Sequence, residues 1–260
     1  MAASADTEYE ELLGFLQHAR PEVRQAAAEG VLSYTEDEEF LAFCQKHPRK
    51  AAKPLLRLVE SSEAASEGTA PGADVMASTS AAAALQALVN LSGSPAVRDA
   101  LLELKALSRC VDALRSGWLE GRTSVAHWHA MLLVNLTVVT AGQEALCENE
   151  GHVAFLMTSY ASDHRPPVRD GVTDSLGCIA KVFANLCVAE KGRALIGTSY
   201  GIGILIKALA ERPRRLDALS VFENLCLDEA RHETICTSVF APTLATFTYP
   251  WGRTSEEDRK

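Results

Sequence analysis

Two stretches near the end of the chain, VFANLCVAEKGRALI (residues 182–196) and VFENLCLDEARHETI (residues 221–235), are near twins. In each, an apolar run with helical spacing reaches Asn-Leu-Cys, and a polar turn follows. An apolar residue pair then comes ten or eleven residues after the asparagine. Self-similarity that includes the turn and the next helical run indicates a repeat architecture.

Four copies of this pattern occur, and each centres on an asparagine near the end of a helical run. These are Asn90 in ALVNLS, Asn135 in LLVNLT, Asn185 in FANLC and Asn224 in FENLC. The asparagines lie 45, 50 and 39 residues apart, which matches the period of armadillo and HEAT repeats. The sequence therefore predicts an all-α, armadillo/HEAT-like α-solenoid of about five repeats. In the first, more degenerate unit, Ser33 takes the place of the asparagine.

The helical segments predict one repeat domain over residues 1–260. Long inner helices are expected at 81–91, 125–136, 171–186 and 216–225, and shorter helices at 97–104, 108–116, 153–160 and 202–210. Residues 61–79 are rich in Ser, Ala, Gly and acidic side chains, which favours a flexible loop between repeats. Residues 227–260 are expected to form an incomplete last repeat, with short helices at 229–239 and 242–249 but no long third helix.

Composition narrows the class of protein. The 260 residues are 47% hydrophobic and carry a net charge of −9, which argues against binding nucleic acid through phosphate contacts and against an anionic lipid surface. The N-terminal stretch has no signal-peptide pattern, and no apolar run approaches membrane-spanning length. Seven cysteines without a C-x-x-C pair indicate reduced core cysteines in a cytoplasmic protein, with the nucleus as the alternative.

Motifs for catalysis are weak. His127 and His129 are two residues apart, so on a helix they point to different sides, whereas a helical zinc pair needs a spacing of four. The GTSYGIG segment at 197–203 lacks both a preceding strand and a Gly-Lys-Ser/Thr end, so it is interpreted as a turn between two helices. We therefore expect no enzyme activity, no metal and no cofactor.

The asparagine column supports two roles, which do not exclude each other. A ladder of amides along a concave face can bind the backbone of an extended protein segment, because an amide both donates and accepts hydrogen bonds. Alternatively, each asparagine bonds helix-end carbonyls or the following loop and fixes the repeat geometry. The candidate protein-binding residues on this face are Asn90, Trp128, Met131, Asn135, Lys181, Asn185, Asp217, Ser220 and Asn224.

Residues four before each asparagine share its helix face. They are Gln86, Met131, Lys181 and Ser220. Armadillo proteins that recognise nuclear-import peptides typically have Trp at this place, so the import groove is not reproduced. Trp128, seven residues before Asn135, provides one aromatic side chain for binding or for core packing.

The series ALVNLS, LLVNLT, VFANLC and NLCLDEARHETI, with RPEVRQAAAEGVLSYT at the start, resembles a family of eukaryotic armadillo-like proteins. These proteins, the HGH family of Brp type, assist the folding of translation elongation factor two. The most telling piece is 224–235, where Asn, Cys, an acidic residue and the pair His232-Glu233 occur in the family's order. Family members continue past the equivalent of residue 260, so the resemblance implies that this chain lacks their C-terminal region.

The resemblance implies a non-catalytic chaperone adaptor. It would bind newly made elongation factor two and link it to ATP-dependent cytosolic chaperones such as the TRiC chaperonin, with no nucleic acid or membrane partner. The alternative is a general armadillo peptide-binding scaffold in signalling or transport, without a chaperone role. A remote third candidate is an enzyme at the GTSYGIG or His127–His129 segment.

Overall fold

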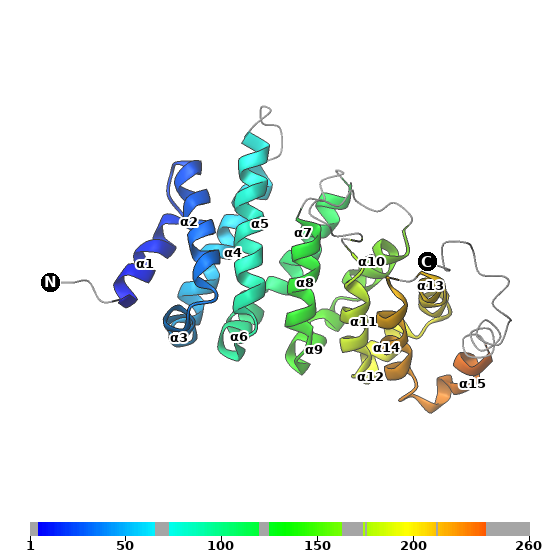
Figure 1. Cartoon of the computed structure of the whole chain (residues 1–260). Coiled ribbons are helices and arrows are strands. Elements are labelled where there is room, and N and C mark those ends of the chain that lie inside the picture. The colour runs from blue at the N-terminus through cyan, green and yellow to red at the C-terminus, as the bar shows by residue number, and fades with distance from the viewer. Residues whose placement is uncertain are drawn as a thin grey trace, which may run out of the picture.

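The computed structural model describes residues 5–65, 73–119, 125–162, 174, 176–211 and 213–237. Every regular element in these ranges is a helix. The helices stack unit upon unit into an elongated array that runs from α1 at one end to α15 at the other (Figure 1). The predicted all-α solenoid is confirmed.

Each full unit contains three helices, and partial units lie at both ends of the described chain. The first unit has α1 (Ala5–Phe15) and α2 (Pro21–Tyr34). The full units are α3 (Glu38–Lys46), α4 (Pro48–Ala65) and α5 (Ala73–Leu91); α6 (Pro95–Glu103), α7 (Ala106–Leu119) and α8 (Ala126–Thr137); α9 (Thr140–Glu148), α10 (Glu150–Ala161) and α11 (Ile179–Cys187); and α12 (Glu190–Ile196), α13 (Ser199–Ala210) and α14 (Arg215–Leu225). The 3-10 helix η1 (Glu229–Arg231) and α15 (His232–Ile235) begin another unit.

The last helices of successive units pack side by side. We call α2, α5, α8, α11 and α14 the inner row, because each contacts the next (Figure 1). The leucine that follows each asparagine is fully buried in this packing, at 0% exposure: Leu91, Leu136, Leu186 and Leu225. The repeated Asn-Leu therefore combines one core anchor with one polar side chain at the same place in every unit.

Several predicted boundaries were wrong. The expected loop at 61–79 is shorter at both ends, because α4 continues to Ala65 and α5 begins at Ala73. Both extensions are rich in alanine, the strongest helix former, which the loop prediction underweighted. α11 begins at Ile179, and the Leu176 amide instead donates to Asp174 Oδ1 (3.2 Å) in a turn. Residues 171–173 and 238–260 lie outside the described residues, and so do the predicted helix at 242–249 and the end of the one at 229–239.

Two glycines allow the first helix of a unit to cross close to the end of the preceding inner helix. A Cβ on Gly142 would lie 1.8 Å from the Leu136 carbonyl oxygen, and one on Gly192 would lie 1.9 Å from that of Leu186. Such separations exclude any side chain larger than hydrogen. The sharp 118° bend between α8 and α9 therefore depends on a glycine seven residues after Asn135.

The residue after each of these glycines caps the inner helix. Gln143 Nε2 donates to the Thr137 carbonyl (3.2 Å), and Arg193 Nη1 donates to the Cys187 carbonyl (3.1 Å). In the last unit His232 Nε2 lies 2.7 Å from the Cys226 carbonyl. The last carbonyls of a helix lack intrahelical donors, so these side chains provide a hydrogen-bond partner at the end of each of these inner helices. His232, part of the stretch that carries the family resemblance, thus has a structural contact.

The start of α14 is held by a buried arginine. Arg214 is only 3% exposed, and its guanidinium pairs with Asp174 and donates to the Tyr160 carbonyl. It also lies 4.3 Å from the centre of the Tyr160 ring. These contacts tie α14 to α10 and to the segment before α11, which fixes the position of Asn224 in the inner row.

Candidate protein-binding site

The asparagines link consecutive inner helices. Asn135 Nδ2 on α8 donates to Ser92 Oγ (2.9 Å) and to the Val89 carbonyl (3.1 Å) at the end of α5. One unit later, Asn185 Nδ2 on α11 makes the same two bonds, to Thr137 Oγ1 (3.1 Å) and the Val134 carbonyl (3.2 Å). Each asparagine therefore binds the preceding unit.

The two outer members of the ladder make one bond each. Asn90 Nδ2 donates to Thr35 Oγ1 (2.8 Å), and Asn224 Nδ2 donates to the Ala184 carbonyl (2.8 Å). In the unit that Asn224 contacts, Cys187 stands at the place that Ser92 and Thr137 hold in the earlier units. Its thiol is a much weaker acceptor than a hydroxyl. The ladder is thus continuous over the described inner row, with weaker junctions at both ends.

Ser33 occupies the asparagine position of the first unit, as expected, since it lies two residues before Thr35. Its Oγ donates to the Gly30 carbonyl of its own helix (2.7 Å). No inner helix precedes α2 among the described residues, so Ser33 has no earlier unit to bind there. The geometry-fixing role proposed for the column is therefore what the structure shows at Asn90, Asn135, Asn185 and Asn224.

The same geometry leaves the other half of three amides open. A backbone carbonyl can only accept, so the atom facing Val89, Val134 or Ala184 must be the NH₂ group. The opposite Oδ1 atoms of Asn135, Asn185 and Asn224 accept no hydrogen bond from the described residues and are not enclosed. These three half-buried asparagines therefore present a row of open acceptors.

The predicted neighbours of the asparagines divide into two groups. Trp128 and Met131 on α8 are half-buried and pack against the core. Lys181 on α11 and Ser220 on α14 are exposed, and Asp217 is half-buried. The face that they share with the asparagines, which we call the ladder face, is therefore apolar along α8 and polar or charged along α11 and α14.

An exposed apolar residue that was not predicted also recurs three positions after Asn135, Asn185 and Asn224. Val138 and Val188 are each 56% exposed, and Leu227 is 63% exposed. We call these three residues the apolar row. Each lies three residues after its asparagine, which was the available signal, but only the structure shows that all three side chains face solvent. Exposed apolar side chains that recur three residues after open acceptors provide both kinds of contact that protein-binding surfaces use.

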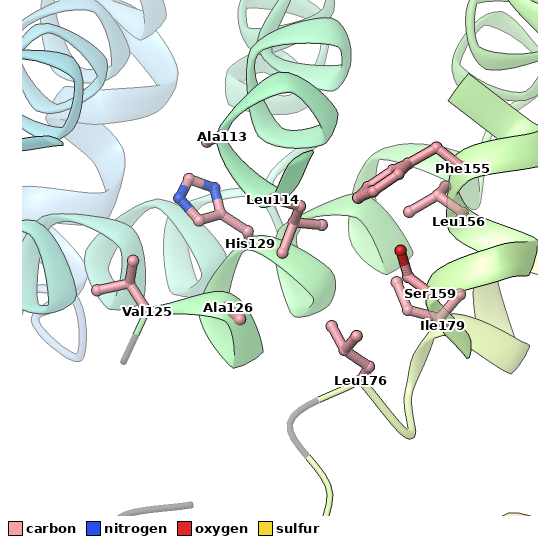
Figure 2. A pocket seen from close by; sticks show the side chains of 10 residues that line it. All are labelled: Ala113, Leu114, Val125, Ala126, His129, Phe155, Leu156, Ser159, Leu176 and Ile179. Atoms are coloured by element: carbon pink, nitrogen blue, oxygen red, sulfur yellow. The ribbon is translucent and has the colours of Figure 1, made fainter. Parts of the chain in front are cut away.

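One of the possible catalytic segments lines a small cavity. His129 is buried and lines a small cavity between α7, α8, α10 and α11, together with Ser159 and mostly apolar side chains (Figure 2). The cavity measures about 20 Å³, enough for one water molecule. In GTSYGIG, α12 ends at Ile196 and α13 begins at Ser199, so only Gly197 and Thr198 form the turn between the two helices. The interpretation of all seven residues as a turn was wrong, because Ser199–Gly203 form the first part of α13.

The thiols and the potential metal ligands bear on whether the described residues hold a reactive or metal-binding site. All seven cysteines are free, and burial raises the pKa of Cys44, Cys178 and Cys187 to about 12, which keeps these thiols neutral. Across the described part of the chain, no three His, Cys, Asp or Glu side chains cluster so that they could hold a metal ion. No single described helix is long and apolar enough to cross a membrane.

Comparisons with known proteins bear on the fold. No family model matches the chain, and no curated protein matches it. Two engineered proteins from the Northeast Structural Genomics Consortium have similar structures, each with a TM-score of 0.63. They are 17% and 16% identical to this chain; both alignments cover 84% of it and 79% and 80% of the engineered chains. At this level of identity the likeness supports the helical solenoid alone.

Proposed function

We propose that the chain is a non-catalytic adaptor that binds an extended protein segment on its ladder face. The observation that carries the proposal is the pairing of open Oδ1 acceptors on Asn135, Asn185 and Asn224 with the exposed apolar row. Backbone N–H groups of an extended segment supply the matching donors, and its apolar side chains cover Val138 and Val188.

The client that the family resemblance favours is newly made translation elongation factor two, and the adaptor would pass it to ATP-driven cytosolic chaperones such as TRiC. The resemblance rests on the repeated Asn-Leu stretches and on residues 224–235. The ladder face gives such a client a surface of the right kind, because a partly folded protein exposes both unpaired backbone N–H groups and apolar side chains.

The test replaces the apolar row, because the asparagines also hold the units together. Val138→Asp with Val188→Asp should weaken binding of purified, partly unfolded elongation factor two at least about tenfold, or ~1.4 kcal/mol, measured by biolayer interferometry. Both side chains already face solvent, so the melting temperature should change little.

A matched control places aspartates on exposed alanines of α10 and α13, which are not part of the inner row. Ala154→Asp on α10 with Ala210→Asp on α13 adds the same two charges at exposed sites. Binding should stay within about twofold of the unchanged chain, under ~0.5 kcal/mol. Equal loss in both double variants would reject the ladder face as the binding surface.

The alternative, a general armadillo scaffold, predicts a different partner at the same face. Affinity capture from cytosol with the full chain separates the two. Elongation factor two with chaperonin subunits supports the adaptor, whereas its absence alongside an enriched signalling or transport protein favours the scaffold. The alternative stays open because the ladder-face chemistry is that of extended-segment binding in general.

A further inference from the structure

A second surface lies between two helices that the ladder face does not use. An open groove of about 460 Å³, a size typical of ligand sites, lies between α1 and α4, with Leu104 after α6 at its edge. Its apolar lining comes from Leu13, Pro54 and Leu104. Gln17 Nε2 donates to the Pro54 carbonyl (3.1 Å), which fixes the end of α1 against α4. The groove is therefore built from packed helices.

The lining is strongly basic. Arg49, Lys50, Lys53 and Arg57 all contribute to it, against a single carboxylate from Glu10. Their spacing on α4 places them along one side of the helix, where like charges four residues apart repel each other and destabilise the helix slightly. The chain as a whole has a net charge of −9, so this groove is a local reversal of the overall charge.

Two of the four cations have partners. Lys50 Nζ lies 2.7 Å from Glu10 Oε1, and Arg49 Nη2 lies 2.7 Å from Glu103 Oε2. Lys53 and Arg57, both exposed, make no ion pair or side-chain hydrogen bond with the described part of the chain. Exposed ion pairs are worth under about 1 kcal/mol, so an incoming carboxylate can also displace the first two.

We propose that this groove, referred to below as the α1/α4 groove, binds an acidic peptide segment of a partner protein in which Asp or Glu residues flank an apolar side chain. Carboxylates would pair with Lys53 and Arg57, and the apolar side chain would lie against the half-buried Pro54 and Leu104. The apolar lining distinguishes this ligand from a bare anion. The overall negative charge disfavours a long polyanion such as RNA, which would extend over acidic surface. The proposal does not depend on what binds the ladder face.

The test is fluorescence anisotropy with the full chain and a labelled peptide, Glu-Glu-Leu-Glu-Glu-Leu-Glu-Glu. The peptide with Gln in place of every Glu should bind at least about tenfold more weakly, a difference of ~1.4 kcal/mol. Lys53→Glu with Arg57→Glu should weaken binding of the acidic peptide by a similar factor. Binding should also fall as salt screens the charges.

The matched control reverses two exposed lysines elsewhere, Lys191→Glu on α12 with Lys207→Glu on α13. It changes the net charge by the same amount and should leave peptide affinity within about twofold. Circular dichroism melting of both double variants checks that the helices remain folded.

Three results would overturn the proposal. The acidic peptide does not bind at all, or both double variants lose affinity equally, which means that only net charge matters. The third is a single-stranded RNA oligonucleotide, or a vesicle of anionic phospholipid, that binds more tightly than the peptide and loses affinity in the Lys53/Arg57 variant.

Discussion

Residues 182–196 and 221–235 are near twins, yet they build different junctions. In the first, Asn185 makes two bonds to the unit before it, and Gly192 lets α12 form directly against the end of α11. In the second, Asn224 makes one bond, and Arg231 stands where the glycine would be. The chain there forms the 3-10 helix η1 before the short α15.

The difference shows what each part of the repeat controls. The asparagine and the buried leucine keep α11 and α14 in the inner row, and these residues are identical in the two stretches. The close crossing of the following helix depends on Gly192, which is replaced by Arg231 in the second stretch. With Arg231 at this place, its guanidinium instead pairs with Asp228 and donates to the Gly197 carbonyl. The repeat thus preserves its inner helix while the next helix varies.

The largest effect is expected when Gly192, which is absent from the second stretch, is replaced. Gly192→Ala would place a Cβ 1.9 Å from the Leu186 carbonyl oxygen and 2.4 Å from its carbon, both backbone atoms that cannot move alone. We expect a loss of at least ~3 kcal/mol in the free energy of unfolding, measured by urea denaturation followed by circular dichroism.

Gly203→Ala is the control for this substitution. Gly203 lies within α13, and a Cβ there would have no neighbour within 4 Å. Because alanine favours helix over glycine, this variant should be unchanged or up to ~1 kcal/mol more stable. An equal loss of stability in both variants would show that the close crossing of α12 and α11 is not what Gly192 provides.

The next effect compares the two ladder asparagines. Asn185→Ala removes two hydrogen bonds between units and Asn224→Ala removes one. At about 1 kcal/mol for each bond, the free energy of unfolding should fall by roughly 2 and 1 kcal/mol respectively. Asn149→Ala, which removes an exposed side chain that caps nothing, should change it by under about 0.5 kcal/mol. A larger loss at Asn224 than at Asn185 would contradict the count of bonds.

The smallest effect should come from repairing the weaker junction. Cys187→Ser restores a hydroxyl at the place of Thr137 and Ser92, where it can accept from Asn224 and donate to the Ala184 carbonyl. We expect a gain of about 0.5 kcal/mol in the free energy of unfolding at pH 7. The gain should disappear in the Asn224→Ala background, and a gain that persists there would assign it to another cause.

The same variant should show a pH dependence of defined sign. Burial raises the pKa of the Cys187 thiol to about 12, whereas an unfolded cysteine ionises near ~8.5. The unfolded state therefore releases its proton first, and the unchanged chain loses stability as pH rises from ~8.5 toward 12. Serine does not ionise in this range, so the advantage of Cys187→Ser should widen above pH 9. A constant difference between pH 7 and 10 would contradict the buried, neutral thiol.

Much of the fold was predictable from local sequence. Apolar spacing located the inner helices, because it is a property of a single helix. The intervals between asparagines identified the repeat, because each interval equals the length of one three-helix unit. The boundaries at Ala65 and Ala73 were missed because polar composition was weighed above alanine's helix propensity. The assignment of Ser33 to the asparagine position succeeded because the rest of that unit keeps the pattern.

The candidate site was less predictable, because it depends on contacts between units. The sequence placed Asn135 and Asn185 on a helix face but could not show which neighbour each amide binds, which requires the packing of α5, α8 and α11. The α1/α4 groove joins residues such as Glu10 and Lys50, which are distant in the chain. The exposure of Val138 and Val188 also depends on how far the next unit covers them.

The amides of Asn135, Asn185 and Asn224 have one end in the solvent and the other in a junction between units. Hydrogen bonds on the two ends of one amide polarise each other, so a donor that arrives at Oδ1 of Asn135 or Asn185 strengthens the Nδ2 bonds to the preceding unit. A bound segment would then stiffen the successive junctions between units along the array. Occupancy of the ladder face would thereby be linked to the stiffness of the array.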